Sequence, residues 1–246
     1  MIYDIHTHNM QHQGCGILME QARQHGIDRF LLLGDVLRYG EFPTAEEVSE
    51  INDDTIACVK ECNGMADGFC FMNPALPPEF IRSEVARCLQ AGLKGVKLEI
   101  SVCCRKPVMD TLMQELEKYD VPLLHHCWFK TVNKYAEESD PVDISILAKR
   151  FPRVRIVMAH LCGCGYRGVE YIADCPNVYV DTSGGQPENG FLQYAVKRIG
   201  ADRLLYGSDA PCRDFGCQVG KVLDGGLSAG DLDKILYKNA LELLKI

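Results

Sequence analysis

The sequence of 246 residues predicts an α/β fold, a (β/α)8 barrel made by one domain over residues 1–246. Three observations predict it. Short β-rich runs recur about every 30 residues, amphipathic helical segments separate them, and no linker or low-complexity tract divides the chain. Strands that alternate with helices favour a parallel sheet, and eight such units are typical of a barrel of roughly 250 residues.

Eight strands are predicted from runs that are rich in branched and aromatic residues. In chain order they cover residues 2–5, 30–33, 68–72, 95–98, 121–124, 155–159, 178–180 and 203–206. Each of the three longest loops follows one of these strands: 34–43, 127–139 and 209–227. In a barrel these loops meet at the rim where the strands end, which is the rim that carries active sites.

The predicted helices between the strands have recognisable boundary signals. Thr44 with Glu47 has the pattern of a capping box. Asp140 before Pro141 has the pattern of an N-cap followed by proline at the first helical position. Ser228 begins the last helix, whose apolar residues recur with a period of 3.6 residues.

Charge and composition limit the kinds of partner. Lysine and arginine number 26 against 34 aspartate and glutamate, for a formal net charge of −8. We therefore expect no nucleic-acid partner, and no apolar run reaches the roughly 20 residues that a membrane span needs. Residues 1–6 lack the basic start of a secretory leader. The 13 cysteines are odd in number and scattered, so we expect reduced thiols and a cytoplasmic protein.

Histidines gather where the predicted strands end, and Asp209 follows the last strand. Five of the 7 histidines lie at such ends: His6, His8, His125, His126 and His160. Burying these polar groups without a partner costs on the order of several kcal/mol, so a divalent metal ion is expected. His6 and His8 are two residues apart and face the same side of a strand, so both can bind one ion. Such ligands suit zinc first, with iron, manganese or nickel as alternatives.

Longer stretches resemble the amidohydrolase superfamily, and within it the amidohydrolase-2 type that includes aminocarboxymuconate-semialdehyde decarboxylase. They follow the family's order over nearly the whole chain: DIHTH (4–8), GVKLE (95–99), VPLLHH (121–126), IVMAH (156–160), NVYVDTSG (177–184), RLLYGSDAP (203–211) and NALELL (239–244). The resemblance implies the metal-dependent barrel fold and a small-molecule substrate. It also implies that copies of the chain associate through their helices.

The same resemblance implies which residues form the site. His6, His8, His126 and Asp209 hold the metal, and His160 either binds a second ion or acts on the substrate as an acid or base. A bound divalent ion lowers the pKa of its water toward 7. Asp209 then takes a proton from that water and passes it to the leaving group.

The fourth predicted strand departs from the family pattern, which often reads GVKLHP where this chain has Glu99 and Ile100. Lys97 and Glu99 share one face of the strand. Either they form a buried ion pair, or Glu99 bridges two metal ions, as a glutamate does in TatD-like hydrolases. A carbamylated Lys97 is a third alternative. If Glu99 is the bridge, the ligands of the binuclear centre are His6, His8, Glu99, His126, His160 and Asp209.

Other polar residues have simpler expected roles. His125 faces away from His126 on a regular strand and is predicted to be a hydrogen-bonded histidine behind the barrel. His12 is expected to be a solvated surface residue, and the cysteines that follow the strands to be small buried residues. Four arginines in rim loops are candidate clamps for a substrate carboxylate or phosphate, although each alone fits a solvated cation: Arg38, Arg105, Arg167 and Arg213.

Two reactions fit this residue pattern. The first is hydrolysis of an amide, ester or lactone carbonyl of a small molecule by metal-activated water. The alternative is nonoxidative decarboxylation of a small carboxylate. Two ions bridged by Glu99 favour hydrolysis, and one ion with a free His160 favours decarboxylation. A non-enzymatic barrel with a structural metal is a third reading, and an open coordination position argues against it.

Overall fold

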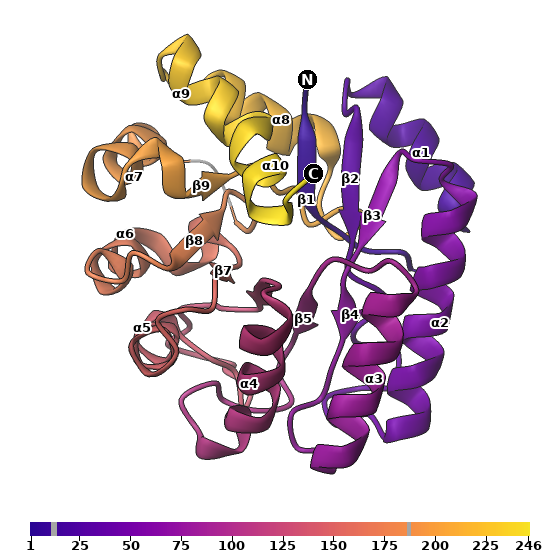
Figure 1. Cartoon of the computed structure of the whole chain (residues 1–246). Helices are drawn as coiled ribbons and strands as arrows, with labels where there is room; N and C mark the ends of the chain where they lie inside the picture. Colours follow the sequence, from indigo (N-terminus) through magenta and orange to yellow (C-terminus); the bar gives the residue numbers. More distant parts are fainter. Residues whose placement is uncertain (11–13, 186–187) are drawn as a thin grey trace.

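The computed structural model describes residues 1–10, 14–185 and 188–246, and His12 lies outside these ranges. Short parallel strands form the centre of the molecule, and helices surround them (Figure 1). The strands are β1 Tyr3–Thr7, β2 Arg29–Leu32, β3 Ala66–Gly68, β4 Cys70–Phe71, β5 Val96–Leu98, β6 Leu123–His125, β7 Ile156–Met158, β8 Val178–Asp181 and β9 Leu204–Leu205. All eight predicted strand regions are therefore present.

Hydrogen bonds between neighbouring strands close the barrel. β1, β2 and β3 pair in one parallel sheet, and β4 to β9 pair in order in a second. Phe69 joins β3 to β4, because its N–H donates to Leu32 O at 2.8 Å and the N–H of Cys70 donates to Gly95 O at 2.9 Å. At the other seam, the N–H of Ile5 donates to Tyr206 O at 2.9 Å. The predicted (β/α)8 barrel is confirmed, with its third strand in two pieces.

The helices alternate with the strands along the chain and cover the outside of the barrel (Figure 1). They are α1 Gly14–Gln24, α2 Ala45–Glu61, α3 Pro78–Gln90, α4 Asp110–Tyr119, α5 Pro141–Arg150, α6 Leu161–Ile172, α7 Phe191–Ile199, α8 Phe215–Leu223, α9 Ala229–Asp233 and α10 Asn239–Leu244. The capping box at Thr44, the N-cap at Asp140 with proline at the first helical position, and the side-chain cap at Ser228 are confirmed; Asp140 also forms a capping box with Asp143. These caps satisfy N–H groups that have no partner inside the helix.

Two helical regions differ from the sequence prediction. The predicted loop 209–227 contains α8, which begins where the Asp214 side chain accepts a hydrogen bond from Cys217 N at 2.8 Å. The predicted last helix is interrupted by a π-helical turn at Lys234–Lys238 between α9 and α10. Beyond this turn, Ala240, Leu243 and Leu244 of α10 pack on the barrel's inner core.

Side chains alternate between an inner and an outer core, as the strand period requires. The inner core fills the barrel with residues from most strands: Tyr3, Ile5, Leu31, Leu33, Phe69, Leu124, Val157, Ala159 and Leu205. The outer core lies between strands and helices and includes Val96, Leu98, Leu123 and Ile156. This alternation determines which polar residues point inward at the rim.

The expectation that all cysteines are reduced is wrong for one pair. Cys15 of α1 and Cys58 of α2 form a disulfide, since the two helices bring their Cα atoms to 5.8 Å, within disulfide range. The remaining cysteines are free, and most are buried as expected; Cys162, Cys212 and Cys217 are partly or fully accessible. Within the described ranges, no helix combines the length and apolar character that crossing a membrane requires.

Candidate metal centre

A bulge in β1 sets the direction of the two histidines of the DIHTH stretch. Asp4 pairs with Phe30 and Thr7 with Leu32, so β1 advances by three residues where β2 advances by two. An extra residue of this kind re-aims the side chains that follow it and is common beside active sites. His6 and His8 therefore lie together at the rim, with ring centroids 5.2 Å apart.

Asp209 completes a group of three converging donors. Its Oδ1 atom lies 3.5 Å from Nε2 of His6 and 3.5 Å from Nε2 of His8. Asp209 has a positive φ of 65°, and its N–H donates to His6 O at 2.7 Å. This short backbone contact holds the turn after β9 against β1, so residues about 200 positions apart in the chain share one site.

The other nitrogen of each histidine is already engaged. Nδ1 of His6 lies 2.8 Å from Oδ2 of Asp181, and Nδ1 of His8 lies 2.8 Å from the Gly34 carbonyl. Both partners are acceptors, so each Nδ1 carries the proton and each Nε2 keeps its lone pair. Metal-binding histidines are usually oriented in this way by a carboxylate or carbonyl.

This donor set fits a divalent metal ion. His6 is fully buried, its Nε2 has no hydrogen-bond partner within the described ranges, and burial lowers its pKa, which keeps the ring neutral. Burial raises the pKa of Asp209, but His160, His8 and His6 outweigh that effect and hold it well below its usual range. The Nε2 lone pairs of His6 and His8 and the negatively charged Asp209 carboxylate thus face one point. A cation bound there would be coordinated by the two nitrogens and would neutralise the carboxylate.

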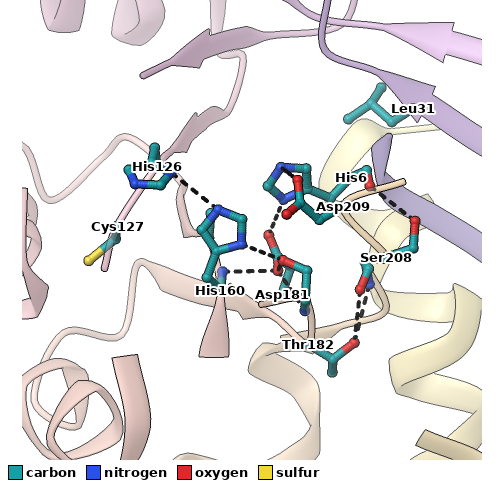
Figure 2. A network of polar contacts seen from close by, with 12 residues as sticks. His6, Leu31, His126, Cys127, His160, Asp181, Thr182, Ser208 and Asp209 are labelled. Atoms are coloured by element: carbon teal, nitrogen blue, oxygen red, sulfur yellow. Dashed lines mark hydrogen bonds and ion pairs between the residues drawn. The ribbon is translucent and has the colours of Figure 1, made fainter. Parts of the chain in front are cut away.

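His160 lies beside this group and is held by the end of β8 (Figure 2). Its ring centroid is 4.9 Å from that of His6, and its Nδ1 lies 2.8 Å from Ser183 Oγ. Asp181 accepts from the backbone N–H of His160 at 3.1 Å and from the Ser183 hydroxyl. Burial lowers the pKa of His160 well below its usual value. Asp181 therefore orients both His6 and the turn that carries His160.

Glu99 and His126 form a second, separate group. Oε2 of Glu99 lies 2.8 Å from Nζ of the buried Lys97, and Oε1 lies 3.0 Å from Nδ1 of His126. Nε2 of His126 lies 3.0 Å from Glu138 Oε1. Burial raises the pKa of Glu99, but His126 and Lys97 outweigh it and lower the pKa to about 2. The structure contains the ion-pair alternative and does not bring Glu99 or His126 into the three-donor group.

The two groups share one cavity. His126 and His160 connect them, with Nδ1 of His126 3.2 Å from Nε2 of His160 (Figure 2). The cavity has a volume of about 160 Å³, and its walls combine both groups with apolar residues: His6, His8, Met10, Val36, Leu37, Lys97, Glu99, His126, Trp128, His160, Asp209 and Cys212. The Trp128 ring lies against His160, with centroids 5.2 Å apart. The cavity thus combines convergent polar groups with an aromatic wall, as small-molecule sites commonly do.

Residues outside the cavity also follow the strand period. His125 lies on the outer face of β6, fully buried, with Nδ1 2.6 Å from the His126 carbonyl. Burial lowers its pKa to about 3.

Of the rim arginines, Arg38 pairs with Asp54 and Arg105 with Asp143, and Arg167 lies over the Phe129 ring. Arg213 alone of the four contacts a cavity residue, Asp209.

Several residues that support the site have weak sequence signals. Asp181 directly follows the predicted strand 178–180 at the same rim, a position that could have identified it. Asp4 starts the DIHTH stretch, and its Oδ1 accepts from His6 N at 2.9 Å and Ser208 N at 3.0 Å. Glu138 and Trp128 lie in the loop after β6, where no periodic pattern indicates which side chains turn inward.

The fold and this donor set define a class, the metal-dependent barrel enzymes. Within that class, the chain belongs to the amidohydrolase family, whose model matches residues 3–246. The family assignment inferred from the sequence motifs is confirmed. No curated protein matches the chain.

Solved structures with the same fold include several decarboxylases. One is 2,6-dihydroxybenzoate decarboxylase complexed with 2,6-dihydroxybenzoate, at 17% identity and a TM-score of 0.81, covering 100% of this chain and 99% of that chain. Another is a dihydroxybenzoic acid decarboxylase from Polaromonas sp. JS666 with bound manganese and the inhibitor 2-nitroresorcinol, at 17% identity, TM-score 0.77, covering 99% and 96%. A third is 5-carboxyvanillate decarboxylase from Sphingomonas paucimobilis, at 14% identity, TM-score 0.76, covering 100% and 99%. These likenesses show the shared fold.

Proposed function

We propose that this protein is a nonoxidative decarboxylase that uses one divalent metal ion and acts on a small planar carboxylic acid. The observation that carries the proposal is the convergent donor set of His6, His8 and Asp209. A second candidate ligand group, His6, His160 and Asp181, shares His6 with it. Zinc is our first choice of metal. Manganese is the alternative because a similar decarboxylase contains it. The proposal treats residues 1–246 as one catalytic domain.

The pairing of Glu99 supports one ion over two. A binuclear centre of the kind considered for hydrolysis needs Glu99 as a bridging ligand. Both of its carboxylate oxygens are instead engaged, one by Lys97 at 2.8 Å and one by His126 at 3.0 Å. Freeing Glu99 would leave the buried Lys97 cation without its anion, which is costly.

The side chains around the cavity have separable roles in decarboxylation. A bound divalent ion supplies Lewis-acid polarisation of a substrate oxygen. When the carbon–carbon bond to the carboxylate breaks, its electron pair stays on the substrate carbon, CO₂ leaves, and that carbon takes a proton. We assign the proton to the pair formed by His126 and His160, whose nitrogens lie 3.2 Å apart at the cavity wall. Trp128 offers a face for the substrate ring.

The His126 ring of this pair is held between two carboxylates. Glu99 and Glu138 each place a carboxylate oxygen 3.0 Å from one of its two ring nitrogens. Burial raises the pKa of Glu138, but His126 and Lys130 outweigh it and lower the pKa, so both carboxylates are acceptors. These two carboxylates therefore engage both ring nitrogens of His126 and fix the orientation of its ring beside His160.

Hydrolysis is the second candidate, and the position of Asp209 favours it. Its carboxylate is ionised and lies at the centre of the donor group, where it can take a proton from an attacking water. The same residues then cleave an amide, ester or lactone carbonyl.

The test combines metal counting with product analysis. The protein is stripped with a chelator, reloaded with Zn²⁺ or Mn²⁺, and assayed for metal per chain by elemental analysis. It is then incubated with 2,6-dihydroxybenzoate, benzene-1,3-dicarboxylate and a panel of lactones and N-acyl compounds. One ion per chain and CO₂ release from a carboxylate are expected. Two ions per chain, with hydrolysis and no CO₂ release, would contradict the proposal and support the second candidate.

A further inference from the structure

Arg213 lies at the edge of the metal-site cavity, between two residues of its wall. Its Nε atom is 3.8 Å from Oδ2 of Asp209, and its guanidinium carbon is 5.9 Å from the centroid of the Trp128 ring. Asp209 thus presents one oxygen to the donor group and the other to Arg213. A guanidinium held against both a carboxylate and an aromatic ring has a restricted orientation.

The outer edge of this guanidinium is available to a ligand. Within residues 1–10, 14–185 and 188–246, neither Nη atom of Arg213 has a hydrogen-bond acceptor. The side chain is 42% exposed, so the free edge is reachable from solvent. Parallel N–H groups on one planar fork match the two oxygens of a carboxylate. Arg213 therefore has the geometry of an anion clamp beside the cavity.

Other cations near the cavity are less available. Lys97 is fully buried and paired with Glu99 at 2.8 Å. Lys130 pairs with the buried Glu138 at 2.6 Å, although it also lies near the Trp128 ring. Arg38 and Arg105 pair with Asp54 and Asp143. Among these described cations, Arg213 alone combines a contact with the donor group and a free hydrogen-bonding edge.

We infer that Arg213, which lies over the Trp128 ring, is a specificity-determining residue that binds a second carboxylate of the substrate, whose class is then a planar dicarboxylate. The inference rests on the proposed function, in which one carboxylate of the ring is lost at the metal site. The second carboxylate stays on the product and pairs with the Arg213 fork. The ring between them lies along Trp128, and the rest of the substrate occupies the cavity.

The experiment uses Trp128, the only tryptophan of the chain, as a fluorescence reporter. Zn²⁺-loaded protein is titrated with benzene-1,3-dicarboxylate and with benzoate, which has the same ring and one carboxylate fewer. The wild-type protein is expected to bind the dicarboxylate about tenfold more tightly than benzoate or better. In Arg213→Gln that preference is lost, while benzoate affinity changes little. In Arg213→Lys, which keeps the charge but not the fork, an intermediate preference is expected.

Arg105→Gln is the matched control, because Arg105 is also a rim arginine but contacts Asp143 and not the cavity. It removes one positive charge and should leave the preference unchanged. Equal Zn²⁺ content in all variants shows that Asp209 is undisturbed. A preference that survives Arg213→Gln, an equal loss in Arg105→Gln, or a wild-type protein that does not prefer the dicarboxylate overturns the inference. None of these readouts depends on CO₂ release, so failure of the proposed decarboxylation is detected separately.

Discussion

Nδ1 of His6 lies 2.8 Å from Oδ2 of Asp181, and both side chains are fully buried. This contact joins the first strand to the end of β8, across 175 positions of the chain. It assigns the proton of His6 to Nδ1 and aims the Nε2 lone pair at Asp209. His6 is therefore prepared for a metal ion by a residue that does not face the ion itself.

The first prediction concerns that supporting contact. Asp181→Asn should weaken Zn²⁺ affinity about 10- to 100-fold, because the amide no longer holds the His6 tautomer and orientation. Isothermal titration calorimetry of metal-free protein with Zn²⁺ measures this. Asp67→Asn is the control. Asp67 is a half-buried carboxylate that pairs with Arg29 away from the donor group. Unchanged affinity in Asp181→Asn would mean that the contact has no role in metal binding.

The second prediction concerns the donors. His6→Ala or Asp209→Asn should lower metal content to a small fraction and reduce metal-dependent kcat/KM by about a thousandfold or more, because each removes one ligand. Folding should remain largely intact, since both residues lie at the rim and not in the apolar core. Elemental analysis, kinetics and circular dichroism check the three statements. Full activity in either variant refutes the assignment of that ligand.

The third prediction uses the pKa of Glu99, which is about 2 in the folded protein against an ordinary 4.5. Because the folded pKa is lower, the resulting stabilisation is complete above about pH 4.5 and is lost as the pH falls toward 2. In metal-free protein, Glu99→Gln should therefore lower the free energy of unfolding by about 3 kcal/mol at pH 7 and by much less near pH 3. Urea denaturation at both pH values measures the difference.

Glu117→Gln is the control for this series, because Glu117 forms a surface pair with Arg153 and should change stability little at either pH. The same Glu99→Gln protein also distinguishes the two roles considered for Glu99. If it binds metal normally, Glu99 is the partner of Lys97 and His126. If it loses one of two ions without losing stability, Glu99 is a bridging ligand and the single-ion proposal is wrong.

The fourth prediction concerns His125. His125→Ala should lower the free energy of unfolding by about 2 to 4 kcal/mol, because it removes a fully buried ring and leaves a void behind β6. Metal content and kcat should change far less, since the side chain lies on the outer face of the strand. Urea denaturation and elemental analysis of the same preparation test both parts. Loss of metal with unchanged stability would show that His125 faces the site.

Local patterns in the sequence determined much of this protein. The spacing of apolar runs predicted the eight strand regions, and the two-residue period predicted that His126 turns inward while His125 turns outward. Charged and hydroxyl residues before apolar runs located the caps at Thr44, Asp140 and Ser228. These features depend on neighbours within a few positions, so they can be read along the chain.

Contacts between distant segments were decided only by the tertiary structure. The sequence allowed Glu99 to be either an ion-pair partner or a metal ligand, and only the structure shows its oxygens paired with Lys97 and His126. No local pattern indicated that Glu138 reaches His126 from a loop. The disulfide of Cys15 with Cys58 depends on how α1 packs against α2, and the role of Asp181 depends on β8 lying near β1. Hydrogen bonds and ion pairs act over a few ångströms of space, whatever the separation in sequence, so only the closed barrel brings these partners within range.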